Sequence, residues 1–255
     1  MRVKDSVFVI TGGASGLGEA CVRHFVSLGG KAAIFDVAAD KGPKLAAEMG
    51  PAAAFFQTDV TSEQSVASAI DQTMKTFGAI HVAVNCAGIG TPAKVLGKKG
   101  PMSLEHFTRV VNLNLVGTMI VIIKAAEKMA LNPPNDEGEK GLIINTASAA
   151  AFEGQIGQAA YSASKAGVVG LTLPVAREFA DYGLRVVTIA PGLFYTPMLM
   201  GLPEEAIKAL AATVPFPKRL GRPHEFALLA EQIVVNPMLN GETIRLDGAI
   251  RMAAK

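Results

Sequence analysis

The chain has 255 residues and a mass of 26.5 kDa; half of its residues are hydrophobic and 18% are charged. This composition excludes a disordered or fibrous protein and allows one large domain with a sizeable core. The 24 Lys and Arg nearly balance the 22 Asp and Glu, so we expect neither nucleic acid nor an anionic membrane as a partner. Two cysteines, Cys21 and Cys86, are too few for a disulfide framework, and no Cys/His spacing predicts a metal site.

Short apolar runs alternate with longer stretches of helical length along the chain. The predicted strands are 7–11, 32–36, 53–57, 80–85, 142–146, 185–189 and 243–246. The predicted helices are 16–28, 38–49, 62–77, 103–130, 158–181 and 223–236. Strands that are apolar on both faces and alternate with helices indicate a parallel sheet covered on both sides. We therefore expect a single α/β domain over residues 1–255, with a doubly wound seven-stranded parallel sheet.

A glycine-rich turn, residues 11–18, directly follows the first predicted strand. Gly12, Gly16 and Gly18 would let backbone approach a pyrophosphate, and the helix that follows would offer free N–H groups to it. A tight strand-to-helix connection without a ligand would also use glycine, so the turn alone is weak evidence.

Asp36 ends the second predicted strand, eighteen positions after Gly18. A carboxylate there would accept hydrogen bonds from the adenosine ribose hydroxyls of a dinucleotide. The same charge would repel a 2′-phosphate by about 4 kcal/mol at about 4 Å, and no Lys or Arg in the turn or directly after Asp36 offsets it. The pattern predicts a Rossmann fold that binds NAD rather than NADP; the alternative is that Asp36 is an ordinary surface turn residue.

An uncharged apolar run lies between Arg109 and Lys124. It is too short to span a membrane and contains Asn112 and Asn114, so we expect a buried helix. The first residues lead directly into a strand and show no targeting signal, so we expect a cytoplasmic protein.

Ser148, Tyr161 and Lys165 stand out beyond the middle of the chain. Lys165 is the one charged residue between Gly154 and Ala176, and Tyr161 lies four positions earlier on the same helix face. Ser148 follows the predicted strand 142–146 at the sheet edge. A core tyrosine and a lysine that reaches solvent would explain each residue alone. Together they predict hydride transfer from a secondary alcohol, with Tyr161 as general acid/base and its pKa lowered by the nearby ammonium and a positive nicotinamide.

Residues 191–217 carry several prolines around a short apolar helix. A long loop beside the carboxyl edge of a sheet is often a lid over the substrate. Met198, Leu199 and Met200 could form an adaptable apolar wall of the substrate pocket or simply pack the lid.

These motifs resemble the short-chain dehydrogenase/reductase family over nearly the whole chain. The resemblance implies a catalytic tetrad of Asn114, Ser148, Tyr161 and Lys165, in which Asn114 holds a water that links Lys165 to a proton relay. It also implies a group of cofactor contacts: Gly12, Ser15, Gly16, Leu17, Gly18, Asp36, Asp59, Val60, Cys86, Ala87, Gly88, Tyr161, Lys165, Pro191, Gly192, Phe194 and Thr196. The substrate contacts that it implies are Ser148, Gln158 and Tyr161.

Longer segments, such as 143–148, 158–165 and 244–252, are similar to members of this family that oxidise 3-hydroxyacyl-CoA thioesters with NAD as homotetramers and tolerate hydroxysteroids. Tyr195 stands where this narrower resemblance predicts a glycine. Lys98 and Lys99 could meet CoA phosphates, although most lysine pairs are solvated surface.

The hypothesis is therefore an NAD-dependent enzyme that interconverts 3-hydroxyacyl-CoA and 3-ketoacyl-CoA. One alternative is a dehydrogenase for hydroxysteroids or other secondary alcohols without CoA. A remote alternative is a non-catalytic scaffold subunit. An apolar cleft would favour a steroid, whereas CoA calls for cations at the mouth of the cleft.

Overall fold

Seven strands form one sheet in the computed structural model, which describes residues 1–98, 100–201 and 203–254. Their bounds are β1 Val7–Thr11, β2 Lys31–Asp36, β3 Ala53–Gln57, β4 Val82–Asn85, β7 Gly141–Thr146, β8 Leu184–Pro191 and β9 Thr243–Leu246. The spatial order is β3-β2-β1-β4-β7-β8-β9, and each neighbouring pair is parallel. The doubly wound seven-stranded sheet predicted from the sequence is confirmed. The strand order reverses between β1 and β4, which is where such sheets bind ligands.

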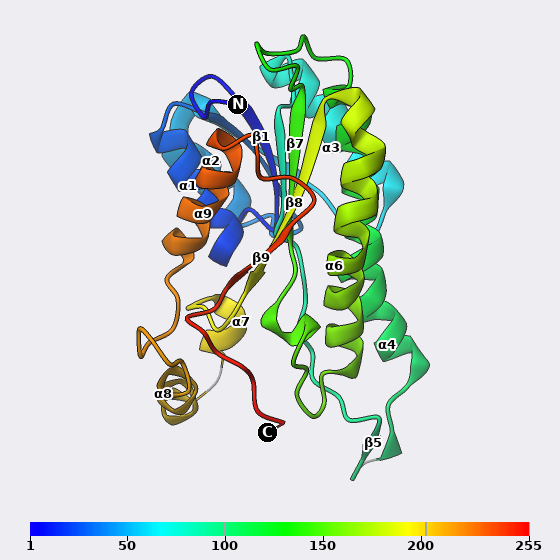
Figure 1. The fold of residues 1–255 in the computed structure, drawn as a ribbon, viewed down its shortest axis with the longest axis vertical. Coiled ribbons are helices and arrows are strands. Elements are labelled where there is room, and N and C mark those ends of the chain that lie inside the picture. The colour runs from blue at the N-terminus through cyan, green and yellow to red at the C-terminus, as the bar shows by residue number, and fades with distance from the viewer. Residues whose placement is uncertain (99, 202, 255) are drawn as a thin grey trace.

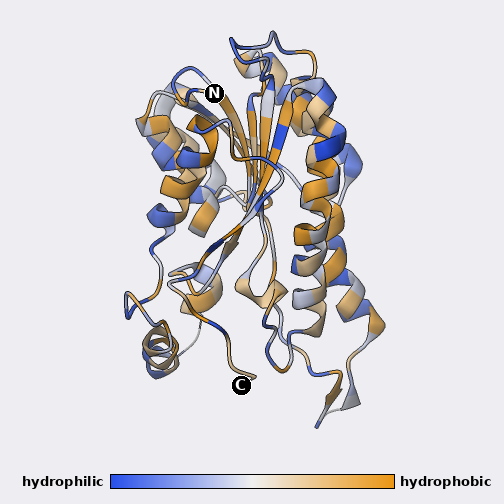
Figure 2. Cartoon of the chain, viewed as in Figure 1, coloured by the Kyte–Doolittle hydropathy of each residue, from blue (hydrophilic) through white to orange (hydrophobic). Residues whose placement is uncertain are grey.

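Helices cover both faces of the sheet (Figure 1). One face carries α1 Gly16–Ser27, α2 Lys41–Met49 and α9 Pro223–Val235, and the other carries α3 Glu63–Phe77, α5 Gly117–Met129 and α6 Ala159–Phe179. Along β1, Phe8 and Ile10 pack toward α1 and α9 whereas Val9 packs toward α3 and α5. This alternation follows from the two-residue period of a strand. The strands are hydrophobic along most of their length (Figure 2), as burial on both faces requires.

One helical run, Leu104–Met129, is long and apolar enough to cross a membrane by length and composition. It consists of α4 Leu104–Val111, a π-helical segment η2 Asn112–Val116 and α5. The run packs against α3, α6, β4 and β7, and 44% of its most apolar window is buried within the chain. In this fold it is a core helix with one outward apolar face. The sequence predicted a continuous helix here and not the π-helical turn.

Short elements decorate the carboxyl end of the sheet. The segment 191–217 contains two helices, α7 Pro197–Met200 and α8 Glu204–Ala212, where the sequence predicted one. A small antiparallel hairpin, β5 Leu96–Gly97 with β6 Gly100–Pro101, was not predicted. The described part of the chain also has three short turns of 3-10 helix: η3 Ala149–Ala151 follows β7, whereas η1 Gly50–Ala52 and η4 Ala180–Tyr182 precede β3 and β8.

Candidate active site

A cleft of about 690 Å³ opens at the carboxyl ends of the strands, on both sides of the β1–β4 reversal. It brings together nearly all of the site residues predicted from the sequence. Those that line it are Gly12, Ser15, Gly16, Leu17, Gly18, Asp36, Asp59, Val60, Cys86, Ala87, Gly88, Ser148, Gln158, Tyr161, Lys165, Pro191, Gly192, Phe194 and Thr196. Residues more than 180 positions apart therefore share one cavity, because parallel strands end at the same edge.

The glycine turn places backbone where side chains would not fit. Gly12 has φ of +61°, and a Cβ there would lie 2.9 Å from the Ala87 backbone nitrogen. A Cβ on Gly18 would collide with the Gly12 carbonyl oxygen. Ser15 precedes α1 without making a capping hydrogen bond through its side chain, so the first N–H groups of the helix remain available to an anion. This cradle suits the pyrophosphate of a dinucleotide.

Asp36 sits at the end of β2 and faces this turn. Its carboxylate accepts hydrogen bonds from the backbone N–H groups of Ala14 and Ala38, both at 3.0 Å. These two bonds orient the carboxylate and leave it further lone pairs for ribose hydroxyls. The charged side chains among the described lining residues are Asp36, Asp59 and Lys165. The end of the cleft at Asp36 therefore carries negative charge.

Lys165 and Tyr161 project from the first turns of α6 into the middle of the cleft. The Lys165 ammonium donates to the Thr146 carbonyl at 2.7 Å and lies 5.9 Å from the centroid of the Tyr161 ring. Burial lowers the pKa of Lys165 to about 8. Burial also raises the pKa of Tyr161, and its hydrogen bond with Ser148 opposes that rise.

The lowered pKa expected for Tyr161 is thus not a property of the protein alone. The ammonium of Lys165 is directed to the Thr146 carbonyl rather than to the phenol oxygen, so desolvation outweighs its field at Tyr161. The chain by itself keeps the phenol protonated at neutral pH. We expect the positive charge of a bound nicotinamide to favour the phenolate.

Asn114 lies behind the wall of the cleft and is fully buried. Its side chain accepts from Ile89 N–H at 2.9 Å and donates to Ile89 O at 2.9 Å and to Ser164 Oγ at 3.0 Å. Both amide hydrogens are therefore used within the protein. In this structure Asn114 clamps a lining residue, Ile89, to the helix that carries Lys165; the water-holding role implied by the family resemblance stays a prediction.

The end of the cleft away from Asp36 is lined mainly by apolar side chains, together with two glutamine side chains. Met198, Leu199, Leu210 and Met252 line it together with Gln155 and Gln158. The Gln155 backbone N–H donates to Gln158 Oε1 at 3.0 Å, which holds the predicted substrate contact in place. Met252 comes from the last residues of the chain, and nothing in the local sequence could have assigned it to the site.

Several predicted residues lie elsewhere. Tyr195 is 54% exposed and does not line the cleft; its backbone N–H donates to Gly221 O at 2.8 Å, so its bulk is not in the pocket. Met200 and Lys98 are also outside the lining. Lys99 lies outside the described residues.

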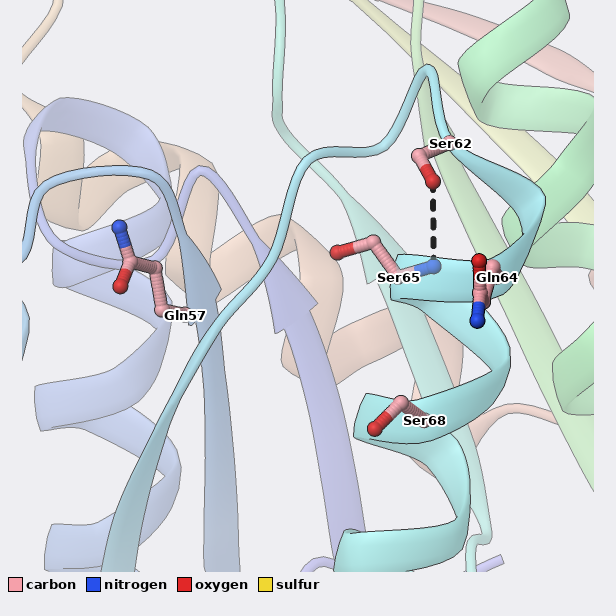
Figure 3. Close-up of a pocket in the computed structure, with 5 residues that line it drawn as sticks. All are labelled: Gln57, Ser62, Gln64, Ser65 and Ser68. Carbon is pink, nitrogen blue, oxygen red and sulfur yellow. Dashed lines mark hydrogen bonds between the residues drawn. The ribbon is translucent and has the colours of Figure 1, made fainter.

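A second, smaller hollow lies on the surface between the end of β3 and the start of α3 (Figure 3). It is lined by Gln57, Ser62, Gln64, Ser65 and Ser68. Ser62 caps α3 by accepting a hydrogen bond from the Ser65 backbone at 3.2 Å. These five side chains include no general base for a serine, so the hollow carries no evident chemistry.

Comparisons with known proteins agree with this geometry. Residues 6–206 match the short chain dehydrogenase family. The chain is 54% identical to 3-hydroxyacyl-CoA dehydrogenase type-2 of Homo sapiens, covering 98% of this chain and 97% of that protein. It is 50% identical to the protein of the same name in Drosophila melanogaster, covering 98% and 99%.

Two solved structures are similar along their whole length. A 3-hydroxyacyl-CoA dehydrogenase type-2 from Mycobacterium avium superposes with a TM-score of 0.93 at 45% identity, covering 98% of this chain and 97% of that one. A 3-ketoacyl-(acyl-carrier-protein) reductase from Brucella melitensis, complexed with NADH, superposes with a TM-score of 0.88 at 28% identity, covering 98% and 100%.

Proposed function

The chain belongs to the short-chain dehydrogenase family and is an oxidoreductase with a nicotinamide cofactor, and we propose that it interconverts 3-hydroxyacyl-CoA and 3-ketoacyl-CoA with NAD. One observation carries the proposal: Ser148, Tyr161 and Lys165 meet in the same cleft as a glycine turn and a ribose-facing carboxylate. The substrate class is supported by the relatives of 50% to 54% identity that are named for it.

The preference for NAD over NADP rests on the charge of the cleft. Asp36 and Asp59 line its adenosine end, and none of the described lining residues there is cationic. A 2′-phosphate would add negative charge beside two carboxylates without a compensating cation. Discrimination against NADP follows from that repulsion.

The side chains divide the work of the reaction. Ser148 would hydrogen-bond the substrate oxygen and hold it near Tyr161, whose phenol takes the proton of the alcohol on oxidation and returns it on reduction. Lys165 would hold the ribose with the ammonium hydrogens that Thr146 leaves free. When bound, the nicotinamide supplies the hydride chemistry.

The segment 191–217 contributes apolar side chains to the substrate end of the cleft. We infer that residues 191–217 act as a lid, since Met198, Leu199 and Leu210 on α7 and α8 line the cleft. Their side chains suit a short acyl chain. The phosphates of CoA would stay outside the cleft, where Lys98 is a candidate contact.

A neutral secondary alcohol without CoA, such as a hydroxysteroid, is a second candidate substrate. The observation that favours it is the absence of a cation among the described residues at the apolar end of the cleft. A steroid needs only an apolar cleft and one hydrogen bond to its hydroxyl.

A substrate panel separates these candidates. We expect NADH to form, seen by its absorbance, when the protein is incubated with 3-hydroxybutyryl-CoA and NAD, and far less product with NADP. Turnover of hydroxysteroids or simple alcohols with no turnover of any acyl-CoA would refute the proposed substrate. Equal turnover with NADP would refute the role given to Asp36.

We further propose a cytoplasmic homotetramer. Support for self-association comes from apolar side chains left exposed on adjoining helical segments: Val116 on η2 is 44% exposed, Ile123 on α5 42% and Leu173 on α6 44%. Apolar faces on neighbouring elements are typical of subunit interfaces.

A further inference from the structure

An ion-pair network lies beside the apolar end of the cleft without lining it. The guanidinium of Arg245, on β9, contacts both carboxylate oxygens of Glu153 at 2.7 and 2.8 Å, Asp247 Oδ2 at 2.7 Å and the Ile250 carbonyl at 3.0 Å. It also lies over the Phe152 ring, 5.0 Å from the centroid. The Arg245 guanidinium lowers the pKa of Glu153, so the pair remains charged at neutral pH. Bidentate pairs of this kind fix geometry as well as charge.

Glu153 stands on a short segment between the two catalytic groups. Toward the N-terminus, its backbone N–H donates to the Ala149 carbonyl at 3.1 Å, and Ala149 directly follows Ser148. The Ala150 N–H donates to Ser148 Oγ at 3.1 Å, so the serine hydroxyl is held by the same turn. A shift of Glu153 therefore moves the turn that orients Ser148.

The other side of this segment packs against the start of α6. A Cβ on Gly154 would collide with the Ser162 hydroxyl, and Ser162 follows Tyr161 in the first turns of the helix. The segment has no space to slide along α6 without pushing on that turn. The position of Glu153 is thus transmitted to Tyr161 as well as to Ser148.

The neighbours of Arg245 on the chain also contact Gly192, a predicted cofactor contact. Leu246, the next residue, accepts a hydrogen bond from the Gly192 N–H at 2.9 Å, and a Cβ on Gly192 would lie 2.8 Å from Asp247 Cβ. Gly192 lines the cleft. The ion pair therefore joins the segment that carries Ser148 to the end of β9, which contacts Gly192 in the cleft.

The last residues of the chain strengthen the same connection. Ile156 N–H donates to the Ala254 carbonyl at 3.0 Å, and the Gln155 side-chain amide donates to the Ala253 carbonyl at 3.1 Å. Met252, between Arg245 and these contacts, lines the cleft.

From these contacts we propose that Arg245 and Glu153 are positioning residues for the reaction: their ion pair holds segment 148–158 against β9 and so sets the approach of Ser148 to Tyr161. Neither side chain lines the cleft, so neither would touch the substrate or the cofactor. The inference rests on the proposed dehydrogenase reaction, but not on the identity of the alcohol. A loss of the pair loosens the alignment of two groups that must meet one substrate oxygen.

The test compares Glu153→Gln and Arg245→Lys with the wild-type protein. Each variant removes the bidentate pair and keeps the contact of residue 245 with Asp247 within reach, so the fold should persist. We expect kcat to fall about 10- to 100-fold, as a misplacement of catalytic groups by about 1 Å does, while the affinity for NAD, measured by calorimetry, stays unchanged. A substrate deuterated at the carbinol carbon should show a larger isotope effect on kcat in the variants, because hydride transfer becomes more rate-limiting.

The matched control is Glu225→Gln. Arg219 and Glu225 form a similar bidentate pair, at 2.6 and 2.9 Å, at the start of α9, and neither residue lines the cleft. This variant should lower the melting temperature without changing kcat or the isotope effect. A Glu153→Gln enzyme with wild-type kcat would overturn the proposal. So would a parallel loss of kcat, NAD affinity and melting temperature, which would indicate a merely structural role.

The assay uses whichever secondary alcohol the wild-type protein oxidises in the substrate panel. A wild-type protein that turns over no acyl-CoA refutes the proposed substrate, whereas unchanged kinetics of the variants on the accepted alcohol refute the positioning role. If Glu153→Gln does not fold, the kinetics of Arg245→Lys test the positioning role: a fall in kcat supports it, and an unchanged kcat refutes it.

Discussion

Burial governs the ionisation of the two side chains at the centre of the site. Burial raises the pKa of Tyr161, so the phenol of the free protein is protonated and can act as a proton donor for ketone reduction. We expect a positive nicotinamide to favour the phenolate, which is the base for alcohol oxidation. Replacing Tyr161 with Phe removes the proton path and leaves the ring in place. We expect turnover to fall by about 10²- to 10⁴-fold with NAD binding retained, measured by NADH formation and by calorimetry. Retained turnover would remove Tyr161 from the mechanism and would require another group as the general acid/base.

Lys165 makes stability depend on pH. Its pKa in the folded chain is about 8, against 10.5 for a free lysine, so between these values the unfolded state binds more protons and stability rises with pH. The unfavourable cost of protonating the buried amine is fully present below about pH 8. In urea titrations, the stability of the wild-type protein relative to Lys165→Met should increase by about 2 to 3 kcal/mol from pH 7 to pH 10. A constant difference across this range would show that Lys165 is solvated in the folded state.

At the scale of elements, the strands were the most predictable part of the chain. The bounds 7–11, 53–57 and 243–246 agree with β1, β3 and β9. β1 is buried along its whole length, whereas β3 and β9 are partly buried edge strands, but all three are short runs bounded by polar or turn residues. The π-helical turn η2 and the two-residue strands of the β5–β6 hairpin were not predictable. The π turn leaves the apolar pattern of the helix intact, and two-residue strands have no measurable period.

Helix α1 packs so closely against the glycine turn that one added methyl group would disturb their contact. In Gly18→Ala the new Cβ meets the Gly12 carbonyl, so α1 must move away from the pyrophosphate cradle. We expect a loss of about 1 to 3 kcal/mol in the free energy of unfolding and a drop in NAD affinity of about tenfold or more. Gly30→Ala is the control, since its Cβ would lie 2.9 Å from the Phe8 ring, outside the cleft. It should destabilise the fold and leave NAD affinity unchanged; equal affinity in both variants would contradict the packing argument.

At the scale of the whole molecule, motifs at strand ends could be placed together from the sequence because a parallel sheet brings those ends to one edge. Gly12, Asp36, Cys86, Ser148 and Pro191 all meet there for that reason. Contacts that do not follow from strand ends meeting at one edge could not be predicted from the sequence. The pairing of Arg245 with Glu153 across 92 positions, and the entry of Met252 into the cleft, depend on the path of the last residues after β9.

Self-association is the remaining property of the whole molecule, and one apolar side chain tests it. Leu173 on α6 is 44% exposed in a single chain, so a glutamate there costs little in a monomer. In a tetramer built on this face the charge would be buried without a partner, at a cost of several kcal/mol. Light scattering should therefore show the 26.5 kDa chain as a tetramer and Leu173→Glu as a smaller species. Leu28→Glu, at the end of α1 on the opposite face of the sheet and 38% exposed, should remain tetrameric. If Leu173→Glu keeps the wild-type mass, the subunits meet through another surface.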